Sequence, residues 1–250
     1  MTDADIDVSI VVAAHNEERL LPRCLDALSR LSGPERVEII VVDNRCTDRT
    51  AEVARAHDGV RVVREEQLGA VHAKAAGVRA ARAPIVAILD ADSVCPPDWI
   101  SRIHDAFALD PSLVGLSGPA RYTNGRAWGP IVVWWWYLWW HFVSFFIGRA
   151  VYAVGTNVAF RRDAYARSTG FDTGVLVGGD EMALFSALRK IGRTRFDLSL
   201  RVDTDGRRTQ IGLARFLWEI VLLQYMINYP VYRLTGRTLR RAYQPGSTLR

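Results

Sequence analysis

The sequence contains little cysteine, and its cysteines follow no pattern that holds a metal or a disulfide framework. The 250 residues include three, Cys24, Cys46 and Cys95, and none of them belongs to a Cys-x-x-Cys pair. Neither a structural zinc site nor a disulfide-rich secreted scaffold is supported, and the pattern fits a protein of the reducing cytosol.

Other common signals are missing as well. The first seven residues carry three aspartates and no basic residue, so we expect no signal peptide. No internal repeat or low-complexity linker divides the chain, which is long enough for one large domain or two tightly joined halves. The net charge is +5, with the arginine excess mostly toward the C-terminus. We expect an anionic substrate or lipid surface, and no nucleic acid, as the partner.

Short apolar runs alternate with helix-type patterns over the first ninety residues. Strands are predicted at residues 8–14, 37–42, 60–63 and 85–89. Helices are predicted to open at residues 15–18, with acids in the first turn, and to follow at 49–57 and 69–81. This alternation predicts a parallel, doubly wound α/β sheet. Ligands bind at the carboxyl ends of such strands, where Asp43 and Asp90 stand.

Beyond residue 92 the alternation changes. We expect a helix at 97–109, strands at 114–122 and 152–160, and a helix from 178 to about 190. We predict one domain over residues 1–210, with a nucleotide-binding half at 1–92 and an acceptor half at 93–210. An apolar insertion at 127–148 interrupts the second half, and residues 211–250 form an apolar helix and a basic tail.

The triplet Asp90-Ala91-Asp92 follows the last of these strands. Breaking the bond between a sugar and a nucleoside diphosphate builds charge on the leaving phosphates, which a Mg²⁺ or Mn²⁺ ion held by carboxylates neutralises. An Asp-x-Asp triplet also occurs by chance, as at residues 3–5 and 203–205. Its place at the end of an apolar strand favours the functional interpretation here.

Several segments, taken together, resemble family 2 glycosyltransferases with the GT-A type fold. The first are VVAAHNEERLLPRCLDAL, VVDNRCTDRTAEVA and GAVHAKAAGVRAARAPIVAILDADS, in that order, and the later ones are GTNVAFRRDAY and FDTGVLVGGDEMALFSALRKIGR. The resemblance covers roughly residues 8–208. It implies a Rossmann-like, mostly parallel sheet flanked by helices, and a hexosyltransferase that uses a nucleotide-sugar donor, most often a UDP-sugar.

The resemblance also implies roles for particular residues. The nucleotide-sugar site would comprise Ala13, Glu17, Asp43, Lys74, Asp90, Ala91 and Arg208. A second Asp often follows the position of Asp43, but Asn44 stands here, and Ala75 stands where an Asn often follows the basic residue. Arg207 and Arg208 fall where related enzymes have basic residues near the diphosphate.

The metal and the base are implied in the same way. Asp90 and Asp92 would bind Mg²⁺ or Mn²⁺, with Asp92 the more direct ligand. Inverting transfer needs a carboxylate that takes the proton of the acceptor. The family places it in a Glu-Asp pair that opens a helix, whereas this chain has Asp180-Glu181. We favour Glu181 as the base and keep Asp180 as the alternative.

Residues 127–148 contain six tryptophans and are long enough to cross a bilayer as a helix. Tryptophan favours the membrane interface over its centre, and a single crossing would separate the Asp90–Asp92 triplet from Asp180 and Glu181. We therefore expect an interfacial helix or a re-entrant hairpin, with residues 211–232 as a second such element. The alternative is that these stretches pack inside the protein or form a homodimer interface.

We predict an inverting, metal-dependent glycosyltransferase at the cytoplasmic side of the cell membrane, with a lipid, lipid-linked or glycan acceptor. A polyprenyl-phosphate sugar transferase of the dolichol-phosphate type is the first alternative. A nucleotidyltransferase is less favoured, because residues 15–18 form no glycine-rich phosphate loop. A non-catalytic membrane module is the last alternative, and it would tolerate Asp92→Asn.

Overall fold

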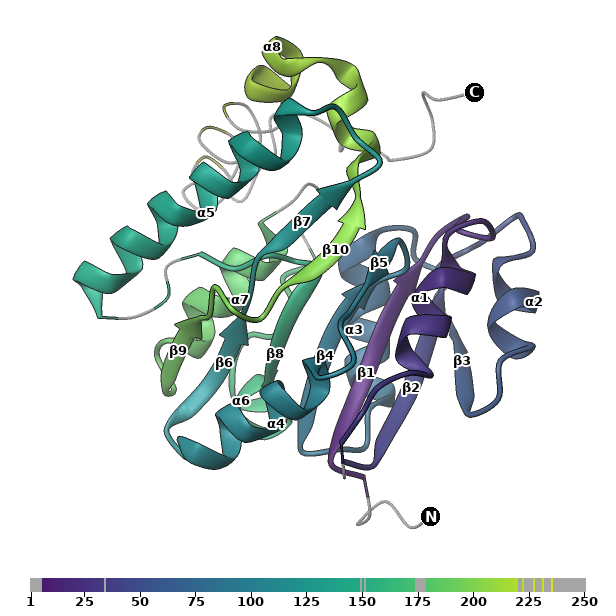
Figure 1. Cartoon of the computed structure of the whole chain (residues 1–250). Helices are drawn as coiled ribbons and strands as arrows, with labels where there is room; N and C mark the ends of the chain where they lie inside the picture. The colour runs from purple at the N-terminus through teal and green to yellow at the C-terminus, as the bar shows by residue number, and fades with distance from the viewer. Residues whose placement is uncertain are drawn as a thin grey trace.

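The computed structural model describes residues 6–33, 35–148, 150, 152–173 and 179–219, together with residues 222, 227, 231 and 235. Its centre is a seven-stranded sheet in the order β3-β2-β1-β4-β8-β6-β9 (Figure 1). The strands are β1 Val8–Ala14, β2 Val37–Asp43, β3 Val60–Arg64, β4 Ile85–Asp90, β6 Leu113–Ser117, β8 Asn157–Arg161 and β9 Arg193–Phe196. The α/β class and the mostly parallel sheet predicted from the sequence are confirmed.

The first four of these strands in the sequence, β1 to β4, run parallel, and β8 enters antiparallel to both β4 and β6. Right-handed crossovers place α1 (Leu21–Leu28) and α2 (Thr50–Arg55) on one face of the sheet and α3 (Ala70–Ala80) on the other (Figure 1). The register pairs Ala14 with Asp43 and Ala13 with Asp90. Both aspartates therefore lie at one edge of the sheet, as predicted.

A three-stranded sheet, β5-β10-β7, stands above that edge. It consists of β5 Ser93–Val94, β10 Val202–Asp205 and β7 Ala120–Thr123. Because β5 directly follows the Asp90–Asp92 turn and pairs with β10, residues near 205 come beside that turn. The backbone N–H of Asp205 donates to the Asp92 carbonyl at 3.2 Å.

The remaining described elements cover the second half of the sheet or extend from it. They are α4 Trp99–Leu109, α5 Trp128–Ile147, α6 Arg162–Arg167, α7 Asp180–Leu188, the 3-10 helix η2 Gly206–Ile211 and α8 Leu213–Phe216. The helix α5 leaves the body of the protein along one side (Figure 1). It is one continuous helix, so the re-entrant hairpin considered for residues 127–148 is wrong.

Three other expectations for local structure are wrong. The first helix begins at Leu21, and α1 carries no acidic side chain in its first turn, because residues 15–20 form turns that bind the neighbouring loop. The strand expected at 114–122 is two strands in different sheets. The chain turns at Gly118, where a Cβ atom would lie 1.8 Å from the Leu200 carbonyl oxygen. Of residues 152–160, only those from Asn157 on form a strand.

The second apolar stretch, 211–232, lies partly outside the described residues, and nearly all of the basic tail lies outside them. Its described beginning contains the end of η2 and the short helix α8. The Phe216 ring of α8 packs edge-on against Trp128 at the start of α5, with ring centroids 5.3 Å apart. The two apolar stretches therefore meet at their beginnings.

Candidate active site

One side of the site is built from two segments that contact each other, the loop after β1 and the chain after β2. The loop after β1 places Glu17, whose backbone N–H donates to Thr50 Oγ1 at 2.8 Å. Asn16, in the left-handed region with φ +56°, accepts a hydrogen bond from the Thr47 backbone N–H at 2.8 Å. These bonds fix the loop after β1 against the loop after β2, so both present their side chains at the carboxyl edge of the sheet.

Asp43 ends β2 and is buried at this edge. Its Oδ1 accepts from the Cys46 backbone N–H at 2.9 Å, and its Oδ2 accepts from Arg64 Nη1 at 3.0 Å. The carboxylate is therefore held in a fixed orientation by the turn that follows it and by the end of β3.

Asn44 holds the loop between β3 and α3 through side-chain hydrogen bonds. Its side-chain oxygen accepts from the Gly69 backbone N–H at 2.7 Å, and its Nδ2 donates to the Glu65 and Gln67 carbonyls at 3.2 and 2.7 Å. A carboxylate has no N–H to donate to those two carbonyls. Asn44, which stands where the resembling family often has a second Asp, therefore fixes the loop that leads into α3.

Asp92 is held by the second sheet. Its Oδ1 accepts from Thr204 Oγ1 at 3.1 Å, and Thr204 also receives a hydrogen bond from Ser93 Oγ at 3.0 Å. Ser93 lies 2.7 Å from Thr156 Oγ1, to which the Asp90 backbone N–H donates at 3.2 Å. This chain of hydroxyl groups joins the Asp90–Asp92 turn to β10 and to the start of β8.

Arg207 completes this side of the site. It donates from Nη2 to Asp92 Oδ2 at 2.9 Å and from both terminal nitrogens to the carboxylate of Glu17. Burial raises the pKa of Glu17, although Arg207 opposes the shift. Two acids from the first half of the chain therefore converge on one cation from the second half.

A second group of acids, Asp180 and Glu181, opens α7. Gly179 precedes them with φ +101°, a conformation that favours glycine, and both acids are buried. Lys74 of α3 is buried as well, and its Nζ lies 3.2 Å from Asp180 Oδ2. A Cβ atom on Gly155 would lie 3.0 Å from Lys74 Nζ and 3.2 Å from Glu181 Oε2, so that glycine lets the chain pass between them.

The two adjacent acids differ in protonation. Burial alone would raise the pKa of Asp180, but the Lys74 ammonium group holds it below its ordinary value. Burial and the neighbouring Asp180 charge raise the pKa of Glu181 to about 8. For Lys74, burial opposes the charged form, yet Asp180, Asp90 and Glu181 raise its pKa above the ordinary value. Asp180 is therefore the charge partner of Lys74, and Glu181 is the group that holds or releases a proton near neutral pH.

The acids at Asp90 and Asp92 fit a hard divalent cation. Both offer carboxylate oxygens, the ligands that Mg²⁺ and Mn²⁺ prefer. Burial raises the pKa of Asp90, with the Asp92 charge adding to it and Lys74 opposing it. The guanidinium group of Arg207 already lies against Asp92, which shows that this position attracts positive charge.

The structure brings the residues implied by the family resemblance to one edge of the sheet, in two groups. Ala13 lies in β1 beside Asp90, and Ala91 is buried in the turn. Arg208 lies near enough to Asp90 and Tyr122 to influence their pKa values. Lys74 lies with Asp180 and Glu181 instead of with Glu17 and Asp92. The resemblance implies Arg207, with Arg208, as a basic residue near the diphosphate but not as a member of the nucleotide-sugar set, and the structure places it against Glu17 and Asp92.

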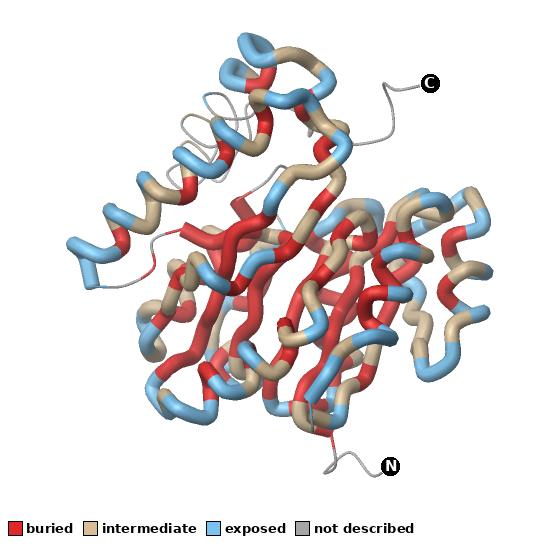
Figure 2. The backbone as a smooth tube through the Cα atoms, in the orientation of Figure 1, coloured by how far each residue is buried: buried red, intermediate tan, exposed pale blue. Residues whose placement is uncertain are grey.

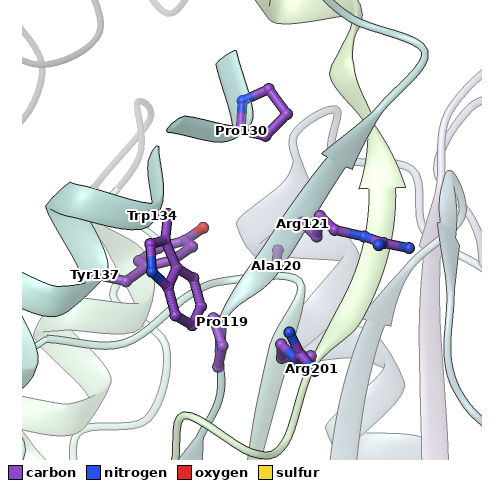
Figure 3. A pocket seen from close by; sticks show the side chains of 7 residues that line it. All are labelled: Pro119, Ala120, Arg121, Pro130, Trp134, Tyr137 and Arg201. Carbon is purple, nitrogen blue, oxygen red and sulfur yellow. The ribbon is translucent and has the colours of Figure 1, made fainter. Parts of the chain in front are cut away.

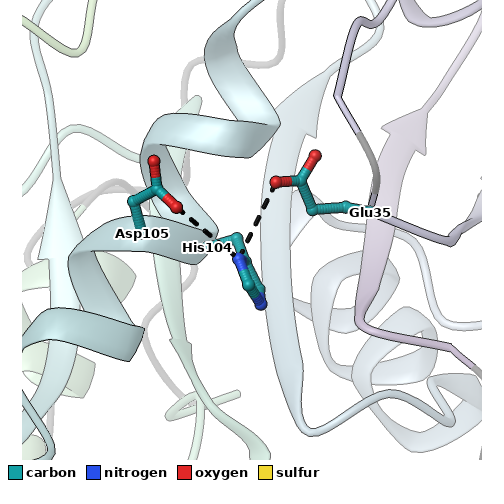
Figure 4. A group of neighbouring side chains, drawn as sticks. All are labelled: Glu35, His104 and Asp105. Carbon is teal, nitrogen blue, oxygen red and sulfur yellow. Dashed lines mark ion pairs between the residues drawn. The ribbon is translucent and has the colours of Figure 1, made fainter.

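A separate group of possible metal ligands lies elsewhere. Glu35, His104 and Asp105 have ligand atoms within 4.8 Å of one another (Figure 4). Glu35 precedes β2, so this group stands at the amino end of that strand, away from the carboxyl edge that holds Asp43 and Asp90. Ser101 Oγ already donates to Glu35 at 2.8 Å. The geometry does not connect this group with the site.

Comparison with known proteins identifies the family. Residues 9–169 match the model of "Glycosyl transferase family 2". The chain belongs to this family. The match includes Glu17, Asp43, Asp90 and Asp92.

Among curated relatives, the undecaprenyl-phosphate 4-deoxy-4-formamido-L-arabinose transferase of Pseudomonas paraeruginosa is 36% identical over 131 residues. The match covers 48% of this chain and 38% of that protein. The chain spans about half or less of the length of the curated relatives it matches.

Two solved structures show the same fold. The mannosyltransferase PcManGT from Pyrobaculum calidifontis, in complex with GDP-Man and Mn²⁺, superposes with a TM-score of 0.66 at 23% identity, covering 92% of this chain and 65% of that one. TarS 1-349 of S. aureus, in complex with UDP, gives a TM-score of 0.67 at 16% identity, covering 80% of this chain and 60% of that one. At this identity the likeness establishes the GT-A type architecture and no more.

Proposed function

We propose that the chain is an inverting, metal-dependent glycosyltransferase that moves a hexose from a nucleoside diphosphate, UDP first among the candidates, to an acceptor hydroxyl. The observation that carries this proposal is the placement of Glu181. It is a buried carboxylate with a pKa raised to about 8, and the Lys74 ammonium group interacts with both Glu181 and Asp90. TarS, solved with UDP, and PcManGT, solved with GDP-Man and Mn²⁺, support a nucleotide-sugar donor and a divalent ion.

Two groups of residues divide the reaction, one around Asp92 and one around Lys74. Asp43 and Glu17 bind the nucleoside, while Arg208 faces the diphosphate and orients the donor. A bound Mg²⁺ or Mn²⁺, held by Asp90 and Asp92, supplies charge neutralisation on the departing diphosphate. Glu181 takes the proton of the acceptor hydroxyl as its oxygen bonds to the anomeric carbon. The bond from that carbon to the diphosphate oxygen breaks in the same step, and the diphosphate leaves with the electron pair.

Lys74 and Asp180 act on the base indirectly. Their buried ion pair fixes the start of α7 against α3, and the charge of Asp180 raises the pKa of Glu181. Glu181 itself accepts the proton, and Asp180 is a positioning residue.

Replacement of Glu181 by Gln tests the assignment directly. We expect Glu181→Gln to lower kcat by at least about a hundredfold, the usual contribution of a general base, and to leave donor binding unchanged. The assay uses a hydroxyl acceptor and measures transfer as the amount of nucleoside diphosphate released. Full activity of a folded Glu181→Gln protein would contradict the hydroxyl-acceptor mechanism.

The exposed face of α5 supports an acceptor at a membrane surface. Among the described residues, α5 is the one helix that is both long enough and apolar enough to cross a bilayer. Only 17% of its most apolar 18-residue segment is buried. Its inner side packs on the protein through Val133 and Tyr137, whereas the outer side is bare (Figure 2). The exposed apolar side chains of α5 are Ile131, Trp134, Trp135, Trp139, Phe142, Phe145, Phe146 and Ile147.

We propose that α5 lies in the membrane interface instead of crossing the bilayer. Trp135 is 67% exposed and Trp139 60%, and indole rings favour the interfacial region. The inner side of the helix stays attached to β7, so a crossing would carry the catalytic sheet into the lipid. The face of the membrane would be the cytoplasmic one, where the three free thiols of the chain remain reduced. A homodimer through the same face is the alternative, and detergent or lipid would dissociate it.

A small pocket beside the N-terminal half of α5 has the chemistry to bind an amphiphilic acceptor. Trp134, Tyr137, Pro119 and Pro130 form apolar walls, and Arg201 reaches its rim from the segment before β10 (Figure 3). An apolar chain against these rings with an anionic group near the arginine is the chemistry of a lipid phosphate.

A second candidate is transfer to a polyprenyl phosphate. The relative from Pseudomonas paraeruginosa, named for undecaprenyl phosphate, favours it. A phosphate acceptor is already ionised and needs no base, so Glu181→Gln would keep most of its activity with that acceptor. Assaying the variant with a hydroxyl-bearing lipid and with a polyprenyl phosphate separates the two functions.

A further inference from the structure

Arg207 spans two acids that belong to the donor site. Its guanidinium group binds Asp92 Oδ2 and both oxygens of Glu17, while Thr204 occupies Asp92 Oδ1. The Arg207 side chain is 32% exposed, against 14% for Glu17 and 16% for Asp92. Both oxygens of Asp92 are therefore engaged, and Arg207 covers the two acids from the solvent side.

The backbone that carries Arg207 is fixed. The Asp205 side chain accepts from the Arg207 backbone N–H at 3.0 Å, and Thr209 Oγ1 donates to the Gly206 carbonyl at 2.7 Å. A Cβ atom on Gly206 would lie 2.7 Å from the Thr123 carbonyl oxygen and 2.8 Å from Gly125 Cα, so the chain has no room to shift there. If Arg207 leaves Asp92, its side chain must rotate on a stationary backbone.

A divalent cation and Arg207 compete for Asp92. A Mg²⁺ or Mn²⁺ ion binds carboxylate oxygens at about 2.1 Å, and a guanidinium group hydrogen-bonded to the same carboxylate would face it as a like charge in a mostly covered site. The ion alone would displace Arg207 from Asp92 and leave it only its contact with Glu17. A nucleoside diphosphate brings phosphate oxygens, which accept forked hydrogen bonds from arginine.

We propose that Arg207 is an internal counterion of the donor site, which makes metal binding depend on the nucleotide. In the donor-free enzyme it holds Glu17 and Asp92 and weakens the affinity of Asp92 for the metal. When the nucleotide enters with the metal, the side chain transfers to the diphosphate and releases both acids. The inference rests on the proposed nucleotide-sugar function and adds an obligatory coupling between its two ligands.

Mn²⁺ binding measured without activity tests this coupling. Free Mn²⁺ is followed by electron paramagnetic resonance, with and without UDP, in the wild type, Arg207→Gln and Arg207→Lys. The matched control is Arg193→Gln, because Arg193 also pairs with an aspartate at 3.0 Å but lies on β9. Melting curves establish that each variant is folded.

We expect Arg207→Gln to bind Mn²⁺ alone about tenfold more tightly than the wild type, within the usual range of coupling between sites. UDP should raise Mn²⁺ affinity strongly in the wild type and weakly in Arg207→Gln. Arg207→Lys, which keeps the charge but loses the fork, should fall between them, and Arg193→Gln should match the wild type.

Two failures are distinguishable. If the wild type binds Mn²⁺ and UDP together but Arg207→Gln gains no affinity for Mn²⁺ alone, the counterion role is wrong and the proposed function stands. If the folded wild type binds neither Mn²⁺ nor any of the UDP, GDP, TDP and CDP nucleotides, the donor site is wrong and the counterion role is overturned with it.

Discussion

At the scale of single residues, the site separates two adjacent acids by their surroundings. Asp180 faces the buried Lys74 ammonium group and stays ionised, while Glu181 lacks that close pairing and has a pKa raised to about 8. The same two residue types in reverse order would exchange these roles only if Lys74 moved as well. The contact with Lys74 therefore supports Glu181 as the base and leaves Asp180 to orient it.

The pH dependence of transfer follows from the raised pKa of Glu181. A general base acts when deprotonated, so kcat/KM should rise with pH and level off above about 8. Lys74→Met removes the positive charge that favours ionisation of both acids, so the rise should move to higher pH. A profile that is flat between pH 6 and 9, or that falls, contradicts the assignment of Glu181.

The sequence predicts these residues as a set but not their partners. Asp43, Asp90, Asp180 and Glu181 stand where local patterns end strands or open a helix, and such positions can be read from the chain. The Lys74–Asp180 pair joins residues 106 positions apart, and Arg207 reaches Glu17 across 190. Contacts of that range depend on how the second sheet docks on the first, which no local pattern encodes.

At the scale of elements, α3 packs against the sheet more closely than a side chain at position 77 would allow. A Cβ atom on Gly77 would lie 2.1 Å from Val11 Cγ1 and 3.1 Å from a methyl group of Val42. Glycine within a helix is ordinarily less stable than alanine by about 1 kcal/mol. Here the close approach of α3 to β1 and β2 reverses that preference.

Gly77→Ala should therefore destabilise the protein by about 1–3 kcal/mol, the usual cost of overpacking a core. The measurement is urea denaturation of both proteins, compared at their midpoints with the slope checked for constancy. An unchanged or increased midpoint would show that α3 can move away from β1 at no cost, against the packing described above.

The aromatic helix α5 gives a prediction about lipid binding. Replacing Trp135, Trp139 and Phe146 by Gln removes three exposed rings, and we expect binding to anionic vesicles to fall at least about tenfold. Leu109→Gln is the matched control, because Leu109 is an 85% exposed apolar residue outside α5. Sedimentation with phosphatidylglycerol vesicles measures the effect. Equal binding of the triple variant and the wild type would exclude α5 as the membrane contact.

Element types were easier to predict from the sequence than their ends and partners. The alternating runs of the first ninety residues predict β1 to β4 and α3 closely. The helix expected at residue 15 fails because Glu17 and Glu18 bind the loop after β2 through their backbone N–H groups instead of continuing a helix. The strand expected at 114–122 fails because Leu200 crowds Gly118, a contact from distant sequence.

At the scale of the whole molecule, two halves meet at Asp90. The first half supplies Asp43 and Glu17 at the carboxyl edge of the parallel strands. The second half returns through β8 and β10 to place Thr156 and Arg207 against the Asp90–Asp92 turn, and α7 places Glu181 near Lys74, whose charge also acts on Asp90. The exposed face of α5 extends from this second half, so the proposed base and the proposed membrane contact belong to the same part of the chain.

The central claim is a metal-dependent nucleotide site at Asp90 and Asp92, and calorimetric titration of UDP tests it most directly. With Mn²⁺ present, we expect tight binding to the wild type and to Glu181→Gln alike, and a loss of at least about tenfold in Asp92→Asn. Without Mn²⁺, the three proteins should bind UDP equally weakly. Equal, metal-independent binding by a folded Asp92→Asn protein and the wild type would contradict the account.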